Sequence, residues 1–200
     1  LQDILQTDEA VVLDLCCGTG DVYLDLRRVA RAKVLGADFC FPMLVAAKEK
    51  AAARSFAPLL VDADALTLPF ADESVHGISI AFGFRNLVNY EAGLVEFLRI
   101  LKPGGRLVIL EFSHPPGLFM KTAYGFYSRV LLPVIGGLVS GSGEAYTYLP
   151  SSIRKFPGAS VLAELVRSVG FTRVEVQLLT GGIAALHVGT KEPRASLLAQ

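Results

Sequence analysis

A glycine-bearing turn after an apolar run is the first feature of this chain that could do chemistry. Residues 11–17 are apolar apart from Asp14, and Gly18-Thr19-Gly20-Asp21 follows them directly. Such a run is typical of a buried parallel strand, and the glycines predict a turn in which the backbone approaches a ligand closely. A dinucleotide-binding fingerprint would need a third glycine at position 23, where Tyr23 stands, so the loop does not favour NAD.

Two further carboxylates follow the next two apolar runs. Asp38 closes the run that starts at Lys33 and lies 18 residues after Gly20, while Asp64-Ala65 follows the run 58–62. A carboxylate can accept two hydrogen bonds from ribose hydroxyls, and an acceptor at position 64 could take an adenine amino group. Because ligands bind beyond the carboxyl ends of parallel strands, the three features together predict a nucleoside site without a phosphate cradle.

The elements that must position these residues alternate between strand and helix. Apolar runs predict strands at 11–17, 33–39, 58–62, 75–82 and 106–112, and residues 21–30 and 41–54 predict helices. Leu94, Phe97, Leu98 and Leu101 lie on one face of a further helix, which Lys102-Pro103-Gly104-Gly105 should end. This alternation indicates an α/β fold with a mostly parallel sheet.

The last third of the chain follows a different pattern. Residues 113–158 are rich in proline, glycine and aromatic residues and predict an insertion near the sheet. A last helix should end at Gly170, and the runs 172–180 and 183–190, joined around Gly181-Gly182, predict an antiparallel hairpin. Residues 1–191 therefore read as a single domain, and 192–200 as a tail.

Composition excludes several functional classes. The 200 residues contain 19 basic and 19 acidic side chains, so no electrostatic footprint for nucleic acid is present. Cys16, Cys17 and Cys40 have neither disulfide nor metal-ligand spacing, which indicates a reducing, cytoplasmic setting and no metal. Mean hydropathy is high at +0.48, yet no run reaches the roughly 18 apolar residues of a spanning helix.

At this point the sequence resembles the class I S-adenosylmethionine-dependent methyltransferases. The order of Asp14, the glycine turn, Asp38, Asp64 and Leu101-Lys-Pro-Gly-Gly105 is typical of that superfamily. One branch, the ubiquinone/menaquinone biosynthesis C-methyltransferases, is similar over roughly residues 11–191. Its more specific motifs resemble Leu68-Pro69-Phe70, Ala81-Phe82-Gly83-Phe84-Arg85-Asn86, Leu110-Glu111-Phe112-Ser113, Tyr146-Thr147-Tyr148-Leu149, Ser152-Ile153 and Leu186-His187.

The resemblance implies a fold, a cofactor and a substrate class. The fold would be a Rossmann-like sheet of seven strands with helices on both faces and a C-terminal antiparallel hairpin. S-adenosylmethionine would be the cofactor and a polyprenylated quinol the methyl acceptor, with demethylmenaquinol favoured over 2-polyprenyl-6-methoxybenzoquinol. The cofactor contacts carried over to this chain are Gly18, Thr19, Gly20, Asp38, Phe39, Asp64, Ala65 and Ala81.

Arg85 and Asn86 are the candidate catalytic residues. A developing phenolate needs a cation or hydrogen-bond donor nearby, and Arg85 follows the fourth strand, while Asn86 could bond the ring oxygen. Guanidinium stays protonated, so Arg85 cannot itself be the base. The alternatives are a surface ion pair for Arg85, and a turn position or helix cap for Asn86. Glu111 is equally a site residue facing Arg85 or a structural partner, and His187 reads as a core histidine.

The apolar insertion predicts contact with a prenyl tail, a membrane surface or a second copy of the chain. The apolar segment within 113–158 is a natural cover for a prenyl tail with partial access to the bilayer, or the interface of a homodimer. Two rival functions stay open: another small-molecule methyltransferase, and a non-catalytic nucleoside-binding scaffold.

Overall fold

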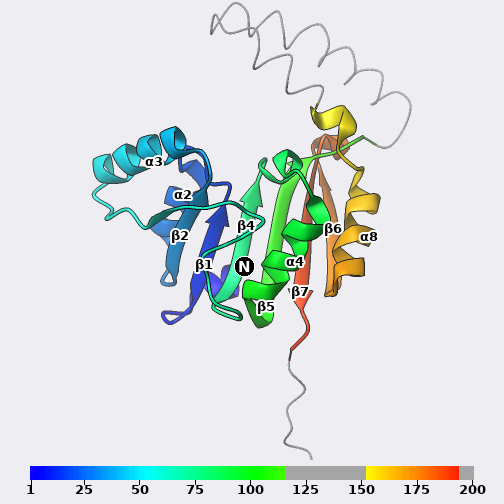
Figure 1. Cartoon of the computed structure of the whole chain (residues 1–200), viewed down its shortest axis with the longest axis horizontal. Coiled ribbons are helices and arrows are strands. Elements are labelled where there is room, and N and C mark those ends of the chain that lie inside the picture. The colour runs from blue at the N-terminus through cyan, green and yellow to red at the C-terminus, as the bar shows by residue number, and fades with distance from the viewer. Residues whose placement is uncertain (116–151, 194–200) are drawn as a thin grey trace, which may run out of the picture.

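The computed structural model describes residues 1–115 and 152–193, which form a seven-stranded sheet with helices on both faces (Figure 1). The strand order is β3-β2-β1-β4-β5-β7-β6. The strands are β1 Val11–Leu15, β2 Lys33–Asp38, β3 Leu60–Asp62, β4 Val75–Ala81, β5 Leu101–Phe112, β6 Phe171–Leu179 and β7 Ala184–Lys191. β7 runs antiparallel to both β5 and β6, while the other pairings are parallel, so the expected α/β class and hairpin are confirmed.

The strand order reverses at β1. β2 and β3 extend the sheet on one side of β1, whereas β4 and β5 extend it on the other. Leu15, the last residue of β1, pairs with Ala37 of β2 and Ile80 of β4. Loops after β1 and β4 therefore diverge to opposite faces, and the crevice between them is where ligands bind in open α/β sheets.

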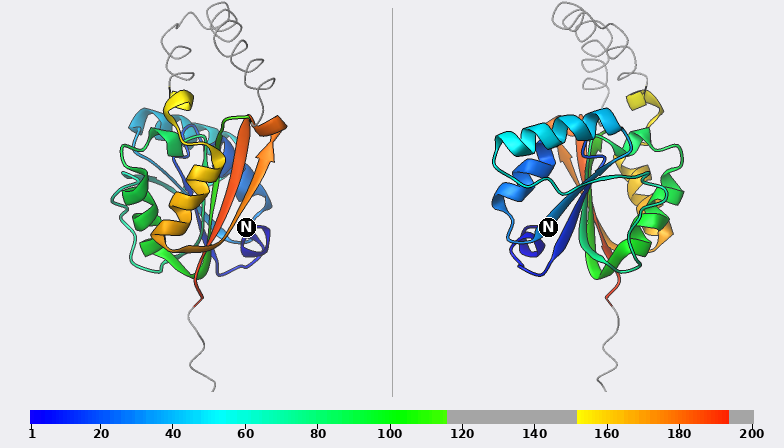
Figure 2. Two further views of the ribbon diagram at one scale, coloured as in Figure 1. Left: turned by 90° about the vertical axis from the view of Figure 1, so that its right-hand side faces the viewer. Right: turned by 60° about the vertical axis from the view of Figure 1, so that its left-hand side comes forward.

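The helices divide between the two faces of the sheet, as Figure 2 shows. α1 Gln2–Leu5, α2 Asp21–Val29 and α3 Phe41–Ala53 lie on one face, and α4 Tyr90–Ile100 and α8 Ala159–Val169 on the other. Each face buries its own apolar cluster, one around Leu24 and Leu44 and one around Phe97 and Leu162. Short 3-10 helices, η1 Phe84–Asn86 and η3 Thr180–Gly182, complete the described elements.

Tyr23 fills the place that a glycine occupies in dinucleotide-binding loops. Its ring is fully buried against β2, where a Cβ on Gly36 would lie 3.2 Å from it. Its hydroxyl accepts hydrogen bonds from the Leu59 N–H at 2.9 Å and from Arg27 at 3.0 Å. The residue that disfavoured NAD in the sequence therefore serves the packing between α2 and the sheet.

The boundary between α4 and β5 differs from the sequence expectation. Leu101 was expected on the apolar face of the helix, but α4 ends at Ile100 and Leu101 is the first residue of β5, paired with Val75. Pro103 has no N–H for a helical bond and disfavours helix in the residue before it. The segment Lys102–Gly105, expected as a turn, is consequently part of the strand. The short helix α1 was not anticipated.

The expected insertion, 113–158, lies mostly outside the described residues. The segment is described up to residue 115 and again from 152. Where it returns, the Ser113 hydroxyl accepts from the Ala159 N–H at 3.2 Å, and His187 Nε2 bonds the Ala159 carbonyl at 2.9 Å. These contacts fix the start of α8 against β5 and β7, and they place His187 in the core, 2 % exposed.

Candidate functional site

The glycine turn connects β1 to α2 at the carboxyl edge of the sheet. Gly18 and Gly20 have φ values of +54° and +84°, which favour glycine. A Cβ on Gly20 would lie 3.0 Å from the Cβ of Ala47 on α3, so this residue also permits close helix packing. The Cys17 N–H donates to the Ala37 carbonyl at 3.0 Å, which ties the start of the turn to β2.

Asp38, the last residue of β2, joins the second strand end to this turn. One carboxylate oxygen accepts from the Gly18 N–H and the other from the Cys40 N–H, both at 2.8 Å. The side chain is 7 % exposed. A carboxylate oxygen has two lone pairs, so each still has one acceptor position. The structure therefore brings Asp38 and the glycine turn together, as the sequence predicted.

Thr19 lies in a polar network that sequence analysis missed. Lys50 reaches from α3 and donates from Nζ to Thr19 Oγ1 at 2.8 Å and to Asp21 Oδ1 at 2.9 Å. Thr19 in turn donates to Asp21 at 3.2 Å. The Lys50 and Asp21 side chains are 40 % and 69 % exposed. In the sequence Lys50 is one of several charged residues on a helix, and nothing in its spacing indicates contact with a turn 31 residues earlier.

The charges of four carboxylates act on Cys16, the residue that precedes the turn. Burial and, after it, the negative charges of Asp38, Asp14, Glu111 and Asp64 raise the pKa of the Cys16 thiol to about 12. These carboxylates come from the ends of four different strands or from the loops that follow them. Glu111 is paired with Arg85, so the carboxylates of this set that could face a cationic ligand are chiefly Asp38 and Asp64.

Asp14, buried in β1, is the least satisfied of these carboxylates. Ser79 of β4 donates to its Oδ1 at 2.6 Å, while Oδ2 is buried with no hydrogen-bond partner. Burial raises the pKa of Asp14 to about 7, and the bond from Ser79 opposes that rise. Asp14 was noticed only as part of the strand motif; its contact with Ser79 depends on which face each side chain takes.

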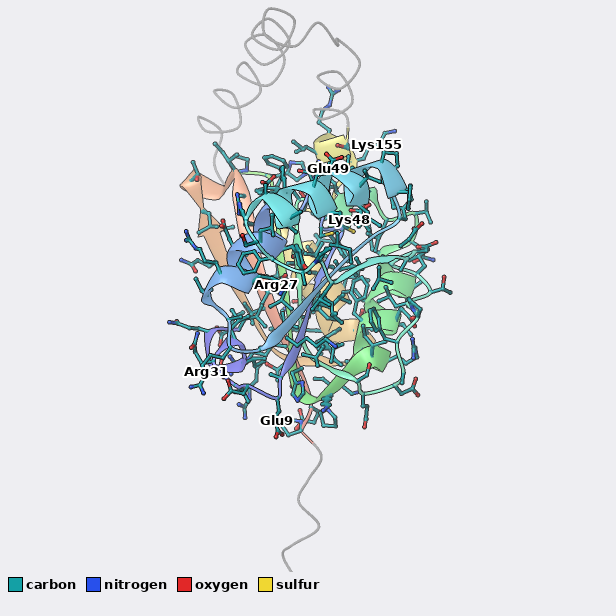
Figure 3. All side chains as sticks on the ribbon, turned by 90° about the vertical axis from the view of Figure 1, so that its left-hand side faces the viewer. Glu9, Arg27, Arg31, Lys48, Glu49 and Lys155 are labelled. Carbon is teal, nitrogen blue, oxygen red and sulfur yellow. The ribbon has the colours of Figure 1, made fainter. Side chains whose placement is uncertain are left out.

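The remaining predicted cofactor residues lie at the same edge of the sheet. Asp64 accepts from the Leu66 N–H at 2.9 Å in the turn after β3, and Ala65 beside it is buried. Phe39, next to Asp38, is 73 % exposed. Ala81 ends β4 and pairs with Leu110 of β5. In Figure 3 the carboxyl edge of the sheet is at the top, where Lys48 and Glu49 of α3 are labelled. Glu9, which precedes β1, marks the opposite end of the molecule.

The loop after β4 packs directly against the residue before the glycine turn. A Cβ on Gly83 would lie 2.3 Å from the Cβ of Cys16, closer than real contacts allow. Only glycine fits where these two loops touch, which explains the glycine in the Phe-Gly-Phe-Arg-Asn sequence. The tight passage turns Phe84 into the core, fully buried, and leaves Asn86 exposed.

Arg85 and Glu111 form a buried ion pair. Arg85 Nη1 lies 2.9 Å from Glu111 Oε1, and the side chains are 9 % and 1 % exposed, so the idea of a surface ion pair for Arg85 is wrong. Nη1 also donates to the Phe82 carbonyl, whereas the buried Nε has no partner. Burial raises the pKa of Glu111, and the positive charge of Arg85 opposes that rise.

Of the two alternatives for Asn86, the helix cap is wrong and the turn position is confirmed. α4 is capped by Asn89, whose side chain accepts from the Ala92 N–H at 3.0 Å. Asn86 instead ends η1, where its N–H donates to the Gly83 carbonyl at 3.1 Å. Its side chain is therefore not committed to starting the helix.

Within residues 1–115 and 152–193, a metal-ligand cluster and a membrane-spanning helix are both absent. There, no group of three or more histidine, cysteine, aspartate or glutamate side chains could hold a metal ion. In the same residues, no helix is long and apolar enough to cross a bilayer.

Comparison with known proteins agrees with this arrangement. The profile of the ubiE/COQ5 methyltransferase family matches residues 3–191. A demethylmenaquinone methyltransferase of Thermus thermophilus is 48 % identical over 181 residues, which cover 90 % of this chain and 82 % of that protein. One of the same name from Deinococcus radiodurans is 44 % identical over 181 residues, covering 90 % and 75 %.

A solved structure shares the fold at low identity. The crystal structure of a SAM-dependent methyltransferase from Aquifex aeolicus aligns with a TM-score of 0.65 and 18 % identity, covering 94 % of this chain and 85 % of that one. Profile, relatives and fold point the same way: the chain belongs to the ubiE/COQ5 methyltransferase family, whose chemistry is methyl transfer from S-adenosylmethionine.

Proposed function

We propose that this chain methylates a ring carbon of a polyprenylated quinol, with demethylmenaquinol as the favoured acceptor. The relatives from Thermus and Deinococcus carry the name of that reaction and match most of this chain. The benzoquinol precursor is the second candidate ring. The observation that carries the proposal is the contact of Asp38 with the glycine turn through the Gly18 N–H, together with Asp64 in the turn after the next strand.

This donor set fits S-adenosylmethionine. The cofactor carries a sulfonium cation, an adenosine and a methionine end, and it supplies the methyl group. Asp38 would accept from the ribose hydroxyls through the lone pairs left free by Gly18 and Cys40. Phe39 and Asp64 would hold the adenine. The full proposed set is Gly18, Thr19, Gly20, Asp38, Phe39, Asp64, Ala65 and Ala81.

Arg85 and Asn86 would act on the acceptor. When a quinol hydroxyl loses its proton, the adjacent ring carbon becomes nucleophilic; it gains the methyl group and then loses its own hydrogen as a proton. Arg85 would stabilise the phenolate as a donor, because Glu111 holds the guanidinium in one orientation. Asn86, exposed at the end of η1, would bond the other ring oxygen. A water is the candidate base, because Glu111, the carboxylate in contact with Arg85, is already paired with the guanidinium.

Calorimetric titration with S-adenosylmethionine tests the cofactor assignment. Asp38→Ala should weaken binding by about tenfold or more, which corresponds to the loss of roughly 1.4 kcal/mol of interaction. Asp62→Ala is a matched control, because Asp62 pairs with Asp38 in the neighbouring strand and is exposed. Equal affinity of the wild type and Asp38→Ala would refute the ribose contact.

Turnover with a panel of quinols and a radiolabelled methyl donor tests the reaction. Label should appear in a demethylmenaquinol more readily than in a benzoquinol. Arg85→Lys should lower kcat far more than it changes cofactor affinity, because a lysine cannot reproduce the planar contact with Glu111. No transfer to any quinol would overturn the proposal.

The domain limits and partners are part of the same proposal. Residues 1–191 would form one domain, in which 113–158 cover the prenyl tail, with 192–200 as a tail. Peripheral membrane contact is supported by the exposed apolar side chains of Phe41, Met43 and Val45 on α3. Co-sedimentation with anionic lipid vesicles should fall in Phe41→Asp. A homodimer is the competing use of an apolar surface, and sedimentation equilibrium decides between them.

A further inference from the structure

Phe82 has a backbone conformation that a phenylalanine rarely adopts. It follows the last residue of β4 with φ +57°, in the left-handed region. For a residue with a large side chain this region costs on the order of 1–3 kcal/mol and persists only where the surroundings impose it. Two hydrogen bonds to its main chain impose it here: the Phe82 N–H donates to the Leu110 carbonyl at 2.8 Å, and the Phe82 carbonyl accepts from the Arg85 side chain.

Stability alone does not explain an aromatic residue at this position. A glycine would adopt the same φ without the steric cost. The ring is also 39 % exposed, so it recovers only part of the free energy that burying a phenylalanine provides. Strained, partly exposed aromatic residues at the edge of a ligand crevice indicate a function for the ring itself.

The Phe82 ring belongs to a small aromatic and cationic surface. It packs on Phe112 of β5, with ring centroids 4.7 Å apart and planes tilted by 43°. The guanidinium carbon of Arg85 lies 5.4 Å from the centroid of Phe112. Gly83, which follows Phe82, contacts the residue before the glycine turn. Phe82 and Phe112 therefore present ring surface between the proposed cofactor turn and the guanidinium of Arg85.

We propose that Phe82 is the platform on which the aromatic ring of the methyl acceptor stacks, with Phe112 fixing its tilt. Stacked or edge-on aromatic pairs are stabilising, and a planar hydroxylated ring seated there would have Arg85 at its edge. The residue thus selects for aromatic acceptors. This inference rests on the proposed quinol methylation, and it assigns the specificity of that site to a residue with no charge and no proton to transfer.

A substitution that removes the Phe82 ring and also removes the backbone strain separates a role in acceptor binding from a structural role. Phe82→Gly should leave the melting temperature equal or higher, because φ +57° suits glycine, yet lower kcat/KM for the acceptor by about tenfold. Affinity for S-adenosylmethionine should stay within about twofold. Ser55→Gly, at an exposed residue with φ +59° outside the crevice, is the matched backbone control and should retain full kcat/KM.

Two more variants keep the test decisive if Phe82→Gly folds poorly. Phe82→Tyr retains an aromatic face and should stay within about threefold of wild type in acceptor KM, whereas Phe82→Leu retains only apolar surface and should raise it by about three- to tenfold. Equal KM values for the leucine and tyrosine variants would overturn the platform. A fall in cofactor affinity parallel to the fall in kcat/KM would assign Phe82 a structural role instead.

Fluorescence quenching measures binding of an aromatic ring at position 82 independently of turnover. The chain contains no tryptophan, so Phe82→Trp introduces a single fluorescent indole. A short-chain naphthoquinone should quench it saturably, and Val29→Trp, at an exposed residue at the end of α2, should show only linear, collisional quenching. Linear quenching in both variants would overturn the inference. Saturable quenching without methyl transfer to any quinol would instead reject the proposed function and retain the aromatic site.

Discussion

Arg85 donates from Nη1 to Glu111 at 2.9 Å in a pair that is almost completely withdrawn from water. Glu111 also accepts from the backbone N–H of Arg85 at 3.1 Å and from that of Phe112 at 2.8 Å. One carboxylate therefore fixes both the side chain and the main chain of the loop after β4. The candidate catalytic cation is held by a β5 residue that need not touch the substrate.

Removing one partner of this pair should be costly. Glu111→Ala leaves the guanidinium buried without its counter-charge and should lower the free energy of unfolding by about 3–5 kcal/mol, measured by urea denaturation. Asp8→Ala is the control, because its pair with Arg31 is 62–65 % exposed and should contribute at most about 1 kcal/mol. The double variant Arg85→Met/Glu111→Leu should recover most of the lost free energy of unfolding but should remain without turnover. A small effect of Glu111→Ala would contradict the buried pairing.

The contact between Gly83 and Cys16 predicts a compensating pair of substitutions. Gly83→Ala places a Cβ 2.3 Å from that of Cys16 and should cost about 1–3 kcal/mol of stability. Cys16→Gly removes the opposing atoms and suits the local φ of +55°, so the double variant should regain most of the loss. Chemical denaturation of the four proteins in this cycle gives the coupling energy. Strict additivity would show that the two residues do not meet.

The raised pKa of Asp14 makes stability depend on pH. Its ordinary value is 3.8 and its folded value about 7, so between these limits the folded chain retains a proton that the unfolded chain has released. The free energy of unfolding therefore falls as pH rises through this window, and the loss is complete above about pH 7. Asp14→Asn, which stays neutral, should gain on the order of 2–4 kcal/mol relative to wild type between about pH 4 and pH 8.

Urea denaturation of both proteins at several pH values measures that difference. Ser79→Ala removes the hydroxyl that donates to Asp14 at 2.6 Å and opposes the rise of its pKa, so the fall in stability should extend to higher pH. Parallel stability curves for the wild type and Asp14→Asn would show that the carboxyl is ionised throughout the window.

Lys50 should affect cofactor binding more than stability. Lys50→Met removes the ammonium from Thr19 and Asp21 and should weaken S-adenosylmethionine binding by about three- to tenfold, an effect that added salt reduces. Stability should change by less than about 1 kcal/mol, because the pair is exposed. Arg54→Met is the control: Arg54 pairs with Asp25 between the same two helices but does not contact the turn. Similar titration results for both variants would exclude a role for Lys50.

The parts of the site that follow locally from the sequence were predictable. The apolar run, the left-handed glycines and the acid at the end of the second strand each need only neighbouring residues, and parallel strands then bring their ends together. The structure accordingly places Gly18 and Asp38 in hydrogen-bond contact. Helix and strand positions followed from the same periodicity to within two residues for most elements.

Contacts between distant residues were not predictable in the same way. β1 and β4 are buried on both faces, so their sequences have no polar alternation to show that Asp14 and Ser79 point toward each other across 65 positions. The pairing of Arg85 with Glu111 was one of two alternatives, because the sequence does not give the depth of the loop after β4. Leu101 fitted the helical face in the sequence, but the proline after it favoured the strand.

The thiols beside the crevice have a chemical consequence for an enzyme that handles quinols. An oxidised acceptor with an unsubstituted ring carbon is an electrophile that arylates thiolates, and a reactive cysteine next to it would inactivate the enzyme. Burial raises the pKa of Cys16 to about 12 and raises the pKa of Cys17 as well, so both thiols stay protonated near neutral pH. Mass spectrometry after exposure of the folded chain to naphthoquinone should find both unmodified. Cys16 and Cys17 can lie beside the quinol site because the fold keeps their thiols buried and protonated, and therefore poorly nucleophilic. Partial unfolding would expose them and restore their reactivity.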